Sequence, residues 1–327
     1  MIKTIKNLFN FFLEDQEFSL LSGVIDIIVV KWPDDSLRSS AFHVRFGTLK
    51  VLDTENVIIN INVNDVRISQ AQMYLLPEGA GYFLEKNEDT NTLVKKLRPS
   101  NSLLNLFNLR KGYNKIEFII NTELQGEHVI EGKIYLFNYE AKLVISDVDG
   151  TITKSDIKGH INYMLGKQWT HDDIAQLYTQ IQKNGYKIVY LSSRPITLYN
   201  YTQKYLKNIQ QNGYKMPDGP TLLSPDLLLN SVNREVILKK ADEFKGALLK
   251  DIQGLFPIGT NPIFAGFGNR DTDAIACLYA GIQVENIYII NEKGEIENIG
   301  KRQIFSYKKI YLNQQELFPV IRKVKIH

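Results

Sequence analysis

The segment Ser146-Asp147-Val148-Asp149-Gly150-Thr151-Ile152-Thr153 directly follows the apolar run 142–146, which we expect to form a strand. In a parallel α/β sheet, ligands bind just beyond the carboxyl ends of the strands. The Asp147 and Asp149 carboxylates, two positions apart, repel each other and favour a bound cation. Gly150 allows a sharp turn that brings backbone groups close to an anion. Taken alone, the segment fits an Asp-Gly turn with solvated acids equally well.

The chain after residue 141 alternates strand-like and helical segments, which predicts a parallel sheet with crossover helices. The expected strands are 142–146, 187–191, 262–267 and 286–290, and the expected helices are 170–184, 198–211, 244–255 and 271–279. We therefore predict an α/β domain over residues 141–327.

Three further groups of polar residues lie at or near strand ends. Ser192 and Arg194 follow the second strand, and Lys245 opens a helix. The loop 267–273, Phe-Gly-Asn-Arg-Asp-Thr-Asp, ends the third strand. Because parallel strands end at one edge of the sheet, a carboxylate nucleophile, a hydroxyl, a cation and an acidic loop are expected to meet there.

This order of groups resembles the haloacid dehalogenase superfamily of phosphatases. The resemblance implies that Asp147 attacks phosphorus and forms an aspartyl-phosphate. It implies that Asp149 protonates the leaving alkoxide and later activates water. Ser192 and Lys245 would then hold the transferring phosphoryl oxygens, which carry most of the charge in the transition state.

The same resemblance implies a magnesium ion, which neutralises repulsion between the nucleophile and the phosphate. Its expected ligands are Asp147, the backbone carbonyl of Asp149, Asn269 and Asp273, although Asp273 could instead orient Lys245. The backbone and side chains expected to line the phosphate are those of Gly150, Thr151, Ser193 and Arg194.

Two of these assignments have alternatives. Ser193 could bond the phosphate in place of Ser192, which we prefer. Arg194 could pair with an acid on the same face instead of contacting the phosphate or headgroup. Five other reactive side chains are expected to have surface or structural roles: Lys239, Lys240, His160, His171 and Cys277.

Residues 1–21 are expected to form an amphipathic helix. Its apolar residues recur at about 100° per residue and share one face. They are Ile2, Ile5, Leu8, Phe9, Phe12 and Leu13. Such a face either packs on the protein's own core or lies in a membrane surface.

Residues 22–140 are expected to form an all-β domain. Short runs rich in β-branched residues are separated by turns, a pattern typical of a sandwich. The polar stretch 86–101 is expected to be a linker or an exposed excursion.

Longer runs resemble the lipin family of phosphatidate phosphatases. They are Asp147 to Asp156, Gly219 to Pro225, Arg234 to Ile237, Ser22 to Asp26 and Phe42 to Gly47. The chain departs from the family where Ser193 replaces a common alanine and Asp271 replaces a common proline. It also has only a short linker where many lipins have a long intervening segment, which places their phosphorylation control in doubt here.

The lipin resemblance implies an immunoglobulin-like β-sandwich over residues 22–140 beside a Rossmann-like, haloacid dehalogenase-type catalytic domain over residues 141–327. It implies phosphatidic acid as substrate and diacylglycerol as product. A substrate embedded in a bilayer favours the membrane interpretation of the N-terminal helix, so we expect a cytoplasmic protein that binds membranes reversibly. Endoplasmic reticulum and nuclear envelope follow from the resemblance alone. A non-catalytic phosphatidate-binding module and a phosphatase for a soluble ester are the alternatives.

Composition agrees with a globular protein of one large or two modest domains. The 327 residues are 44% hydrophobic and 23% charged, with a net charge of +3. That charge does not favour a nucleic-acid partner. The single cysteine excludes an intrachain disulfide and favours a reducing compartment. No apolar run reaches the ~20 residues of a membrane span, and the sequence does not fix the oligomeric state.

Overall fold

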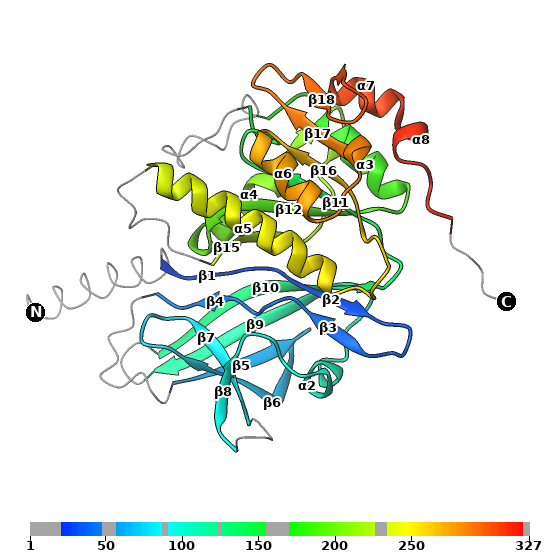
Figure 1. Cartoon of the computed structure of the whole chain (residues 1–327). Coiled ribbons are helices and arrows are strands. Elements are labelled where there is room, and N and C mark those ends of the chain that lie inside the picture. Colours follow the sequence, from blue (N-terminus) through cyan, green and yellow to red (C-terminus); the bar gives the residue numbers. More distant parts are fainter. Residues whose placement is uncertain are drawn as a thin grey trace, which may run out of the picture. The chain divides into compact units, whose positions relative to one another are not determined.

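The structure, a computed structural model, describes residues 21–47, 57–86, 91–122, 126–154, 170–225 and 234–322 (Figure 1). The chain divides into two compact units. The first comprises residues 1–137 with the short segments 195–200 and 225–227, and the second comprises the remainder. The residues expected to form the membrane helix lie outside the described residues.

A seven-stranded mixed sheet forms the centre of the second unit. Its strands lie in the order β15 (Thr221–Ser224), β12 (Lys187–Pro195), β11 (Leu143–Asp147), β16 (Ile263–Gly268), β17 (Ile287–Ile290), β18 (Ile296–Asn298) and β19 (Gln303–Phe305). β11 pairs in parallel with β12 and β16, whereas β18 and β19 add an antiparallel edge. By chain order the first five strands run 3-2-1-4-5, so the order reverses between β11 and β16, where doubly wound folds bind ligands.

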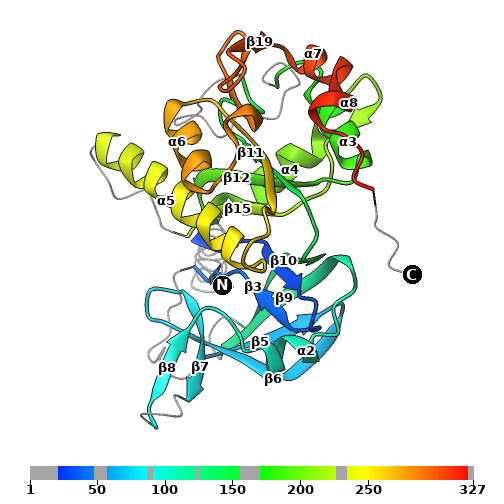
Figure 2. The ribbon, with the colours of Figure 1, turned by 45° about the vertical axis from the view of Figure 1, so that its right-hand side comes forward.

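Helices cover both faces of this sheet. They are α3 (Ile174–Lys183), α4 (Tyr199–Asn208), α5 (Arg234–Gly254), α6 (Asp271–Tyr279), α7 (Tyr307–Leu312) and α8 (Gln314–Leu317). Figure 2 shows α5 and α6 on one face and α3, α7 and α8 on the other. A small hairpin of β13 (Gln210–Gln211) and β14 (Tyr214–Lys215) follows α4.

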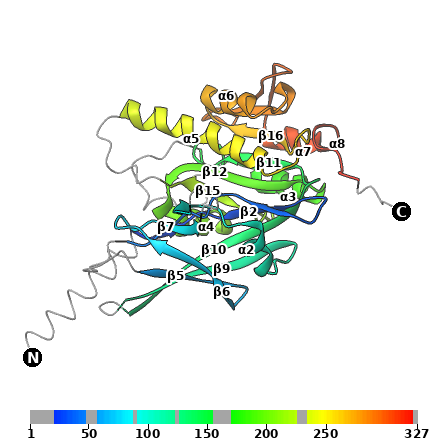
Figure 3. The ribbon, with the colours of Figure 1, turned by 60° about the horizontal axis from the view of Figure 1, so that its bottom comes forward.

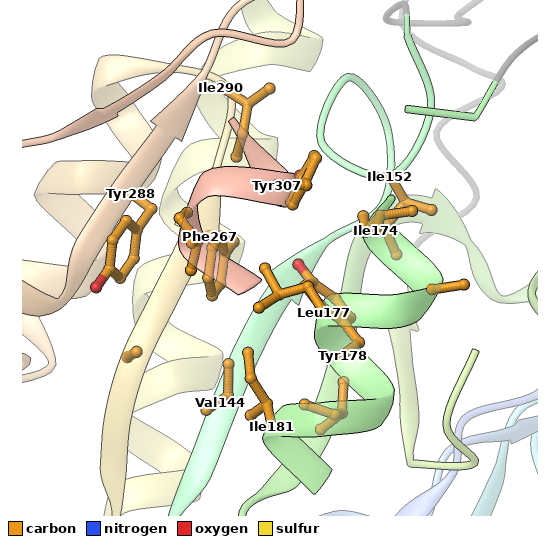
Figure 4. Packing of buried hydrophobic residues seen from close by; sticks show 14 of the residues in the cluster. Val144, Ile152, Ile174, Leu177, Tyr178, Ile181, Phe267, Tyr288, Ile290 and Tyr307 are labelled. Carbon is orange, nitrogen blue, oxygen red and sulfur yellow. The ribbon is translucent and has the colours of Figure 1, made fainter. Parts of the chain in front are cut away.

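The core of the second unit is rich in aromatic rings. Phe267 of β16 stacks on Tyr288 of β17 with centroids 4.7 Å apart, and Tyr178 of α3 lies 5.6 Å from Phe267. Figure 4 shows α3 packing Ile174, Leu177 and Ile181 toward these strands. Burying each such side chain contributes about 1.5–3 kcal/mol, so this packing fixes the strands that carry the polar residues.

The first unit is β-rich. An eight-stranded sheet runs in the order β3-β2-β10-β9-β5-β6-β7-β8, of which Figure 3 shows β10, β9, β5 and β6 side by side. β1 (Gly23–Val24) pairs separately with β4 (Val44–Arg45). The other bounds are β2 (Ile27–Lys31), β3 (Leu37–Ser39), β5 (Ile58–Val63), β6 (Val66–Leu75), β7 (Gly81–Lys86), β8 (Leu93–Lys96), β9 (Gly112–Thr122), β10 (Gly126–Asn138) and helix α2 (Asn101–Leu106).

Alternation along its strands gives this sheet one buried face. In β9, Ile116, Phe118 and Ile120 are fully buried while the residues between them are partly exposed. This period of two is what a strand with one face on a core requires.

The segment 195–200 belongs to the first unit although β12 and α4 flank it in sequence. The hydroxyl of Tyr199 donates to Oδ1 of Asp26 at 2.5 Å, and the backbone N–H of Lys133 donates to the same oxygen at 3.1 Å. Gly23 approaches the backbone of Ile196 so closely that a Cβ would lie 2.2 Å from its carbonyl oxygen. This segment is therefore fixed tightly within the first unit.

The expected fold classes, an α/β region and a β-rich region, are both present. Two local expectations differ. Helix α5 begins at Arg234 and not at residue 244, so Lys245 lies within this helix and does not open it. Residues 93–96 of the expected linker form β8, which pairs with β7. All four β8 side chains are exposed, so the strand lacks the alternating hydrophobicity that identifies a strand by sequence. Within the described part of the chain, no helix is long and apolar enough to cross a bilayer.

Candidate active site

The turn after β11 places Asp147 at the carboxyl end of the central strand. The N–H of Val148 still bonds to Leu191 of β12, but then the chain turns, and Ile152 and Thr153 donate to the carbonyl of Val148. Gly150 has φ +82°, a conformation that glycine adopts without strain. The turn leaves Asp147 only 5% exposed.

Lys245 joins this aspartate to a second one. Its Nζ lies 2.6 Å from Oδ1 of Asp147 and 2.7 Å from Oδ1 of Asp273. All three residues are at least nine-tenths buried. A buried ammonium between two carboxylates is stable only because both partners hold it. The lysine is therefore fixed beside the Asp147 carboxylate.

The loop after β16 positions Asp273. Its Oδ2 accepts hydrogen bonds from the backbone N–H groups of Asn269 at 2.9 Å and Arg270 at 3.2 Å. Gly268 makes this approach possible, because a Cβ there would lie 2.3 Å from Cβ of Asp273. Asp273 thus closes the loop with one oxygen and orients Lys245 with the other.

In the trio formed by Asp147, Lys245 and Asp273, burial and neighbouring charges shift the pKa values of Asp147 and Lys245. Burial, opposed by Lys245, raises the pKa of Asp147 to about 7, and the charges of Asp273 and Asp149 add to this effect. Burial by itself would lower the pKa of Lys245, but the two carboxylates raise it above its ordinary value, so the lysine stays charged. A buried carboxylate of this kind favours a further cation.

Asp149 pairs with residues of β12. Arg194 donates from Nη2 to Oδ1 at 2.6 Å and from Nε to both oxygens at 3.2 and 3.0 Å. Ser192 donates from Oγ to Oδ2 at 3.0 Å. Of the two roles considered for Arg194, the structure therefore shows the pairing with an acid, Asp149. The adjacent Ser193 is partly exposed.

Buried tyrosines support the turn, and the sequence analysis missed them. Tyr178 of α3 donates to Ser146 Oγ at 2.8 Å, and Ser146 donates to the Asp147 carbonyl at 2.9 Å. Tyr307 of α7 donates to the carbonyl of Thr151 at 2.8 Å. Both tyrosines lie on apolar helix faces, and sequence pattern alone gives no sign that such a tyrosine holds the turn.

The donor set suits magnesium in chemical type. Carboxylates, an amide and backbone carbonyls are oxygen ligands that Mg²⁺ prefers. Oδ2 of Asp147 has the Thr151 hydroxyl 3.5 Å away, and this oxygen is not the one that Lys245 contacts. Among the described residues no group of three or more His, Cys, Asp or Glu side chains is arranged to hold a metal. A bound ion would take further ligands from backbone carbonyls and Asn269.

His171 and Cys277 are buried outside this arrangement. Burial raises the pKa of the Cys277 thiol to about 12, so the thiolate needed by a nucleophile does not form near neutral pH. His171 packs its ring 5.9 Å from that of Tyr307. Lys239 and Lys240 lie in α5, and their side chains, like His160, are outside the described residues.

Comparison with known proteins places the chain in a family. The family described as LNS2 (Lipin/Ned1/Smp2) matches residues 95–319, and the lipin N-terminal conserved region matches residues 1–101. The chain belongs to the lipin family. The LNS2 match includes the whole Asp147 turn, the Lys245 helix and the Asp273 loop. The residues expected to be catalytic in this lipin thus all fall within the segment that the LNS2 family matches.

Individual relatives are also similar to this chain in sequence. The chain is 41% identical to human phosphatidate phosphatase LPIN1 over 230 residues and 41% identical to Arabidopsis thaliana phosphatidate phosphatase PAH1 over 228 residues. It is 39% identical to Saccharomyces cerevisiae phosphatidic acid phosphohydrolase 1 over 240 residues. These matches cover 69–70% of this chain but only 25–27% of each relative's length. One chain of the Pnkp1/Rnl/Hen1 complex aligns with 46% of this chain at 22% identity and a TM-score of 0.33.

Proposed function

We propose that this lipin-family chain is a magnesium-dependent phosphatidate phosphatase that hydrolyses phosphatidic acid to diacylglycerol and phosphate. The observation that carries the proposal is the Lys245 ammonium, held between Asp147 and Asp273 at the point where the strand order reverses. Relatives named as phosphatidate phosphatases are 41% identical to this chain over 230 and 228 residues. Fold alone would not identify the reaction, but this trio supplies a nucleophile with a fixed cation.

The first half of the reaction forms a covalent intermediate. Oδ2 of Asp147, the oxygen that does not contact Lys245, attacks phosphorus as the bond from phosphorus to the glycerol oxygen breaks. Lys245 stabilises the negative charge that develops on the phosphoryl oxygens. Asp149 gives its proton to the leaving oxygen, so diacylglycerol departs as a neutral alcohol.

The second half returns the enzyme to its starting state. Asp149, now a carboxylate, takes a proton from the water that attacks phosphorus, and the bond between phosphorus and Asp147 breaks. Phosphate leaves and Asp147 is again a carboxylate. Ser192, or Ser193 as the alternative, holds the phosphoryl oxygens through both halves, together with the backbone of Gly150 and Thr151.

Magnesium is part of the proposal because Asp147 must be anionic to attack. Burial raises the pKa of this carboxyl to about 7 even with Lys245 beside it. A bound Mg²⁺ supplies the second positive charge that keeps the carboxylate ionised and neutralises the phosphate. Asp147, the carbonyl of Asp149 and Asn269 would hold the ion. Asp273 is a weaker candidate, because both its oxygens already accept hydrogen bonds.

The remaining expectations are proposed with the activity. The apolar face of residues 1–14 holds the enzyme reversibly on a cytoplasmic membrane surface, where the substrate lies. The endoplasmic reticulum and nuclear envelope are the proposed membranes. We also propose that the two sheets of the first unit correspond to an immunoglobulin-like sandwich; their antiparallel pairing and single buried face support this description.

The test is phosphate release from phosphatidate in mixed micelles or liposomes, with magnesium or with excess chelator. Wild type is compared with Asp147→Asn and with the matched control Asp172→Asn, whose side chain is 85% exposed. We expect release from wild type and the control only with magnesium, and none from Asp147→Asn. Wild-type turnover by Asp147→Asn would exclude the covalent mechanism. Liposome binding without release by any protein would favour a non-catalytic phosphatidate-binding module.

A second measurement tests the substrate class. Rates on phosphatidate in vesicles and on a soluble phosphate ester are compared before and after removal of residues 1–14. We expect truncation to reduce only the rate on vesicles. Equal rates on both substrates, unaffected by truncation, would favour a phosphatase for a soluble ester.

A further inference from the structure

Asp149, Ser192 and Arg194 satisfy one another's hydrogen bonds in the free protein. Oδ1 of Asp149 accepts from Nη2 and Nε of Arg194, and Oδ2 accepts from Nε and from Ser192 Oγ. The proposed reaction needs these groups elsewhere: Asp149 on the leaving oxygen, and Ser192 on the phosphoryl group. The free protein therefore holds the acid in an arrangement that the reaction has to break.

The arrangement is strong because the groups are shielded from water and fixed from both sides. The side chains of Arg194 and Asp149 are 11% and 18% exposed. Nη1 of Arg194 donates to Thr202 Oγ1 at 3.1 Å, and its backbone N–H donates to Ser192 Oγ at 3.1 Å. A guanidinium that binds both oxygens of a carboxylate makes a strong, orientation-specific contact. Neither partner will exchange for water alone.

We propose that Arg194 and Ser192 form a latch on Asp149, and that the substrate's phosphate opens the latch by replacing the carboxylate. This inference rests on the proposed phosphatase function. The phosphate oxygens accept the guanidinium N–H groups and the Ser192 hydroxyl, which frees Asp149 to act on the leaving oxygen. Only O–H bonds change in this step: the released Asp149 carboxylate takes up a proton from solvent before it acts as the acid, and it returns that proton to solvent when the latch re-forms.

Chemistry favours the exchange. A phosphate monoester carries close to two negative charges and three acceptor oxygens near neutral pH, against one charge and two oxygens for a carboxylate. The planar fork of Arg194 matches phosphate as well as carboxylate geometry. The same guanidinium therefore has two competing anionic partners, and Asp149 becomes available only when a phosphate is bound.

Competition for one guanidinium predicts a specific pattern of phosphate affinity. Removing the negative charge of Asp149 weakens its contact with Arg194, so the guanidinium binds the ligand more readily. We expect Asp149→Asn to bind inorganic phosphate about 10-fold or more tightly than wild type, a typical size for coupling between sites. Arg194→Gln should then lose more phosphate affinity in the Asp149→Asn background than in the wild-type background.

The experiment is a double-mutant cycle on inorganic phosphate binding, measured by titration calorimetry with excess magnesium. The four proteins are wild type, Asp149→Asn, Arg194→Gln and the double variant. Loss of repulsion between Asp149 and phosphate would also tighten binding, but that gain does not depend on Arg194. An unchanged affinity when Arg194→Gln is added to Asp149→Asn would overturn the latch, as would no binding by any of the four proteins.

Arg194→Lys gives a second variant in case Arg194→Gln does not fold. It keeps the charge and loses the fork, so it should bind phosphate less tightly than Asp149→Asn when combined with that change. Equal affinity would count against the latch. Binding of inorganic phosphate needs no turnover, so the two proposals can fail separately. If the effect of Arg194→Gln on phosphate affinity depends on Asp149 but phosphatidate is not hydrolysed, the latch stands and the proposed function is rejected. If phosphatidate is hydrolysed but the two substitutions act independently on phosphate affinity, the function stands and the latch is rejected.

Discussion

A buried carboxylate in the first unit, Asp26, and one in the second, Asp147, have sharply different surroundings. Asp26 of the first unit is fully buried and accepts hydrogen bonds from a backbone N–H and the Tyr199 phenol. Asp147 of the second unit is 5% exposed and shares a lysine with Asp273. Neutral donors satisfy the Asp26 carboxylate and hold it in place. Asp147 has a cation and an anion beside it, so its carboxylate favours binding a further cation. Burial alone therefore does not identify a reactive acid.

The largest expected effect comes from breaking the charged trio of the second unit. Lys245→Met leaves two buried carboxylates without their shared cation, and removing one member of a buried pair costs about 3–5 kcal/mol. Loss of the charge at the phosphoryl group should also lower turnover by about 100-fold or more. Denaturant unfolding and phosphate release measure the two effects.

The matched control is Lys250→Met on the same helix, where the exposed Lys250 side chain lies 4.9 Å from the Tyr279 ring. We expect little change in either quantity. If both variants lost stability equally, the cost would belong to helix α5 in general and not to the trio.

A smaller effect is expected from displacing Asp273 without changing its charge. In Gly268→Ala the new Cβ would meet Cβ of Asp273 at 2.3 Å, so the loop has to shift. Such overpacking costs about 1–3 kcal/mol, and the displaced Asp273 should orient Lys245 less well, which lowers turnover. The control Gly254→Ala meets nothing within 4 Å. Wild-type stability and turnover in Gly268→Ala would show that the loop tolerates the shift.

The sequence predicted the second unit better than the first. Apolar runs followed by Asp, Ser and Gly identified β11, β12 and β16, because buried parallel strands have continuous hydrophobic sequence. The short strands β18, β19 and β8 were missed. Mostly exposed residues in β19 and β8 weaken the period of two. β18 alternates, but its three residues are too few for the pattern to identify a strand. Pairing with a neighbour rather than local sequence keeps these strands extended.

The candidate site shows the same limit. The sequence predicted that Asp147, Lys245 and Asp273 lie at one edge of the sheet. In the structure Lys245 forms ion pairs with both aspartates. The sequence could not choose the partner of Arg194, because Asp149 and a phosphate are both anions that a guanidinium can bind. Nor could it identify Tyr178 or Tyr307, whose hydroxyls reach the turn from helices that are otherwise apolar.

The first unit should respond more weakly than the second to loss of a carboxylate partner. Tyr199→Phe removes the hydroxyl that donates to Asp26 at 2.5 Å while keeping the ring, and we expect a loss of about 1–3 kcal/mol for a buried acceptor left with one bond fewer. Tyr201→Phe, at a side chain 46% exposed, is the control. Thermal unfolding of both variants measures the difference. If Tyr199→Phe lost as much unfolding free energy as Lys245→Met, neutral donors and a charged partner would stabilise a buried carboxylate equally, and the contrast between the two units would fail.

The smallest expected effect is a pH dependence in the second unit that does not involve its acids. Burial lowers the pKa of His171 below its ordinary value of 6.5. The unfolded chain therefore takes up a proton near pH 6.5 while the folded protein does not, so stability is complete above that pH and falls as the pH drops below it. The slope cannot exceed about 1.4 kcal/mol per pH unit for one proton. His171→Gln should flatten this part of the curve in denaturant unfolding between pH 5 and pH 8. An unchanged slope would mean that groups other than His171 set the pH dependence of stability in this range.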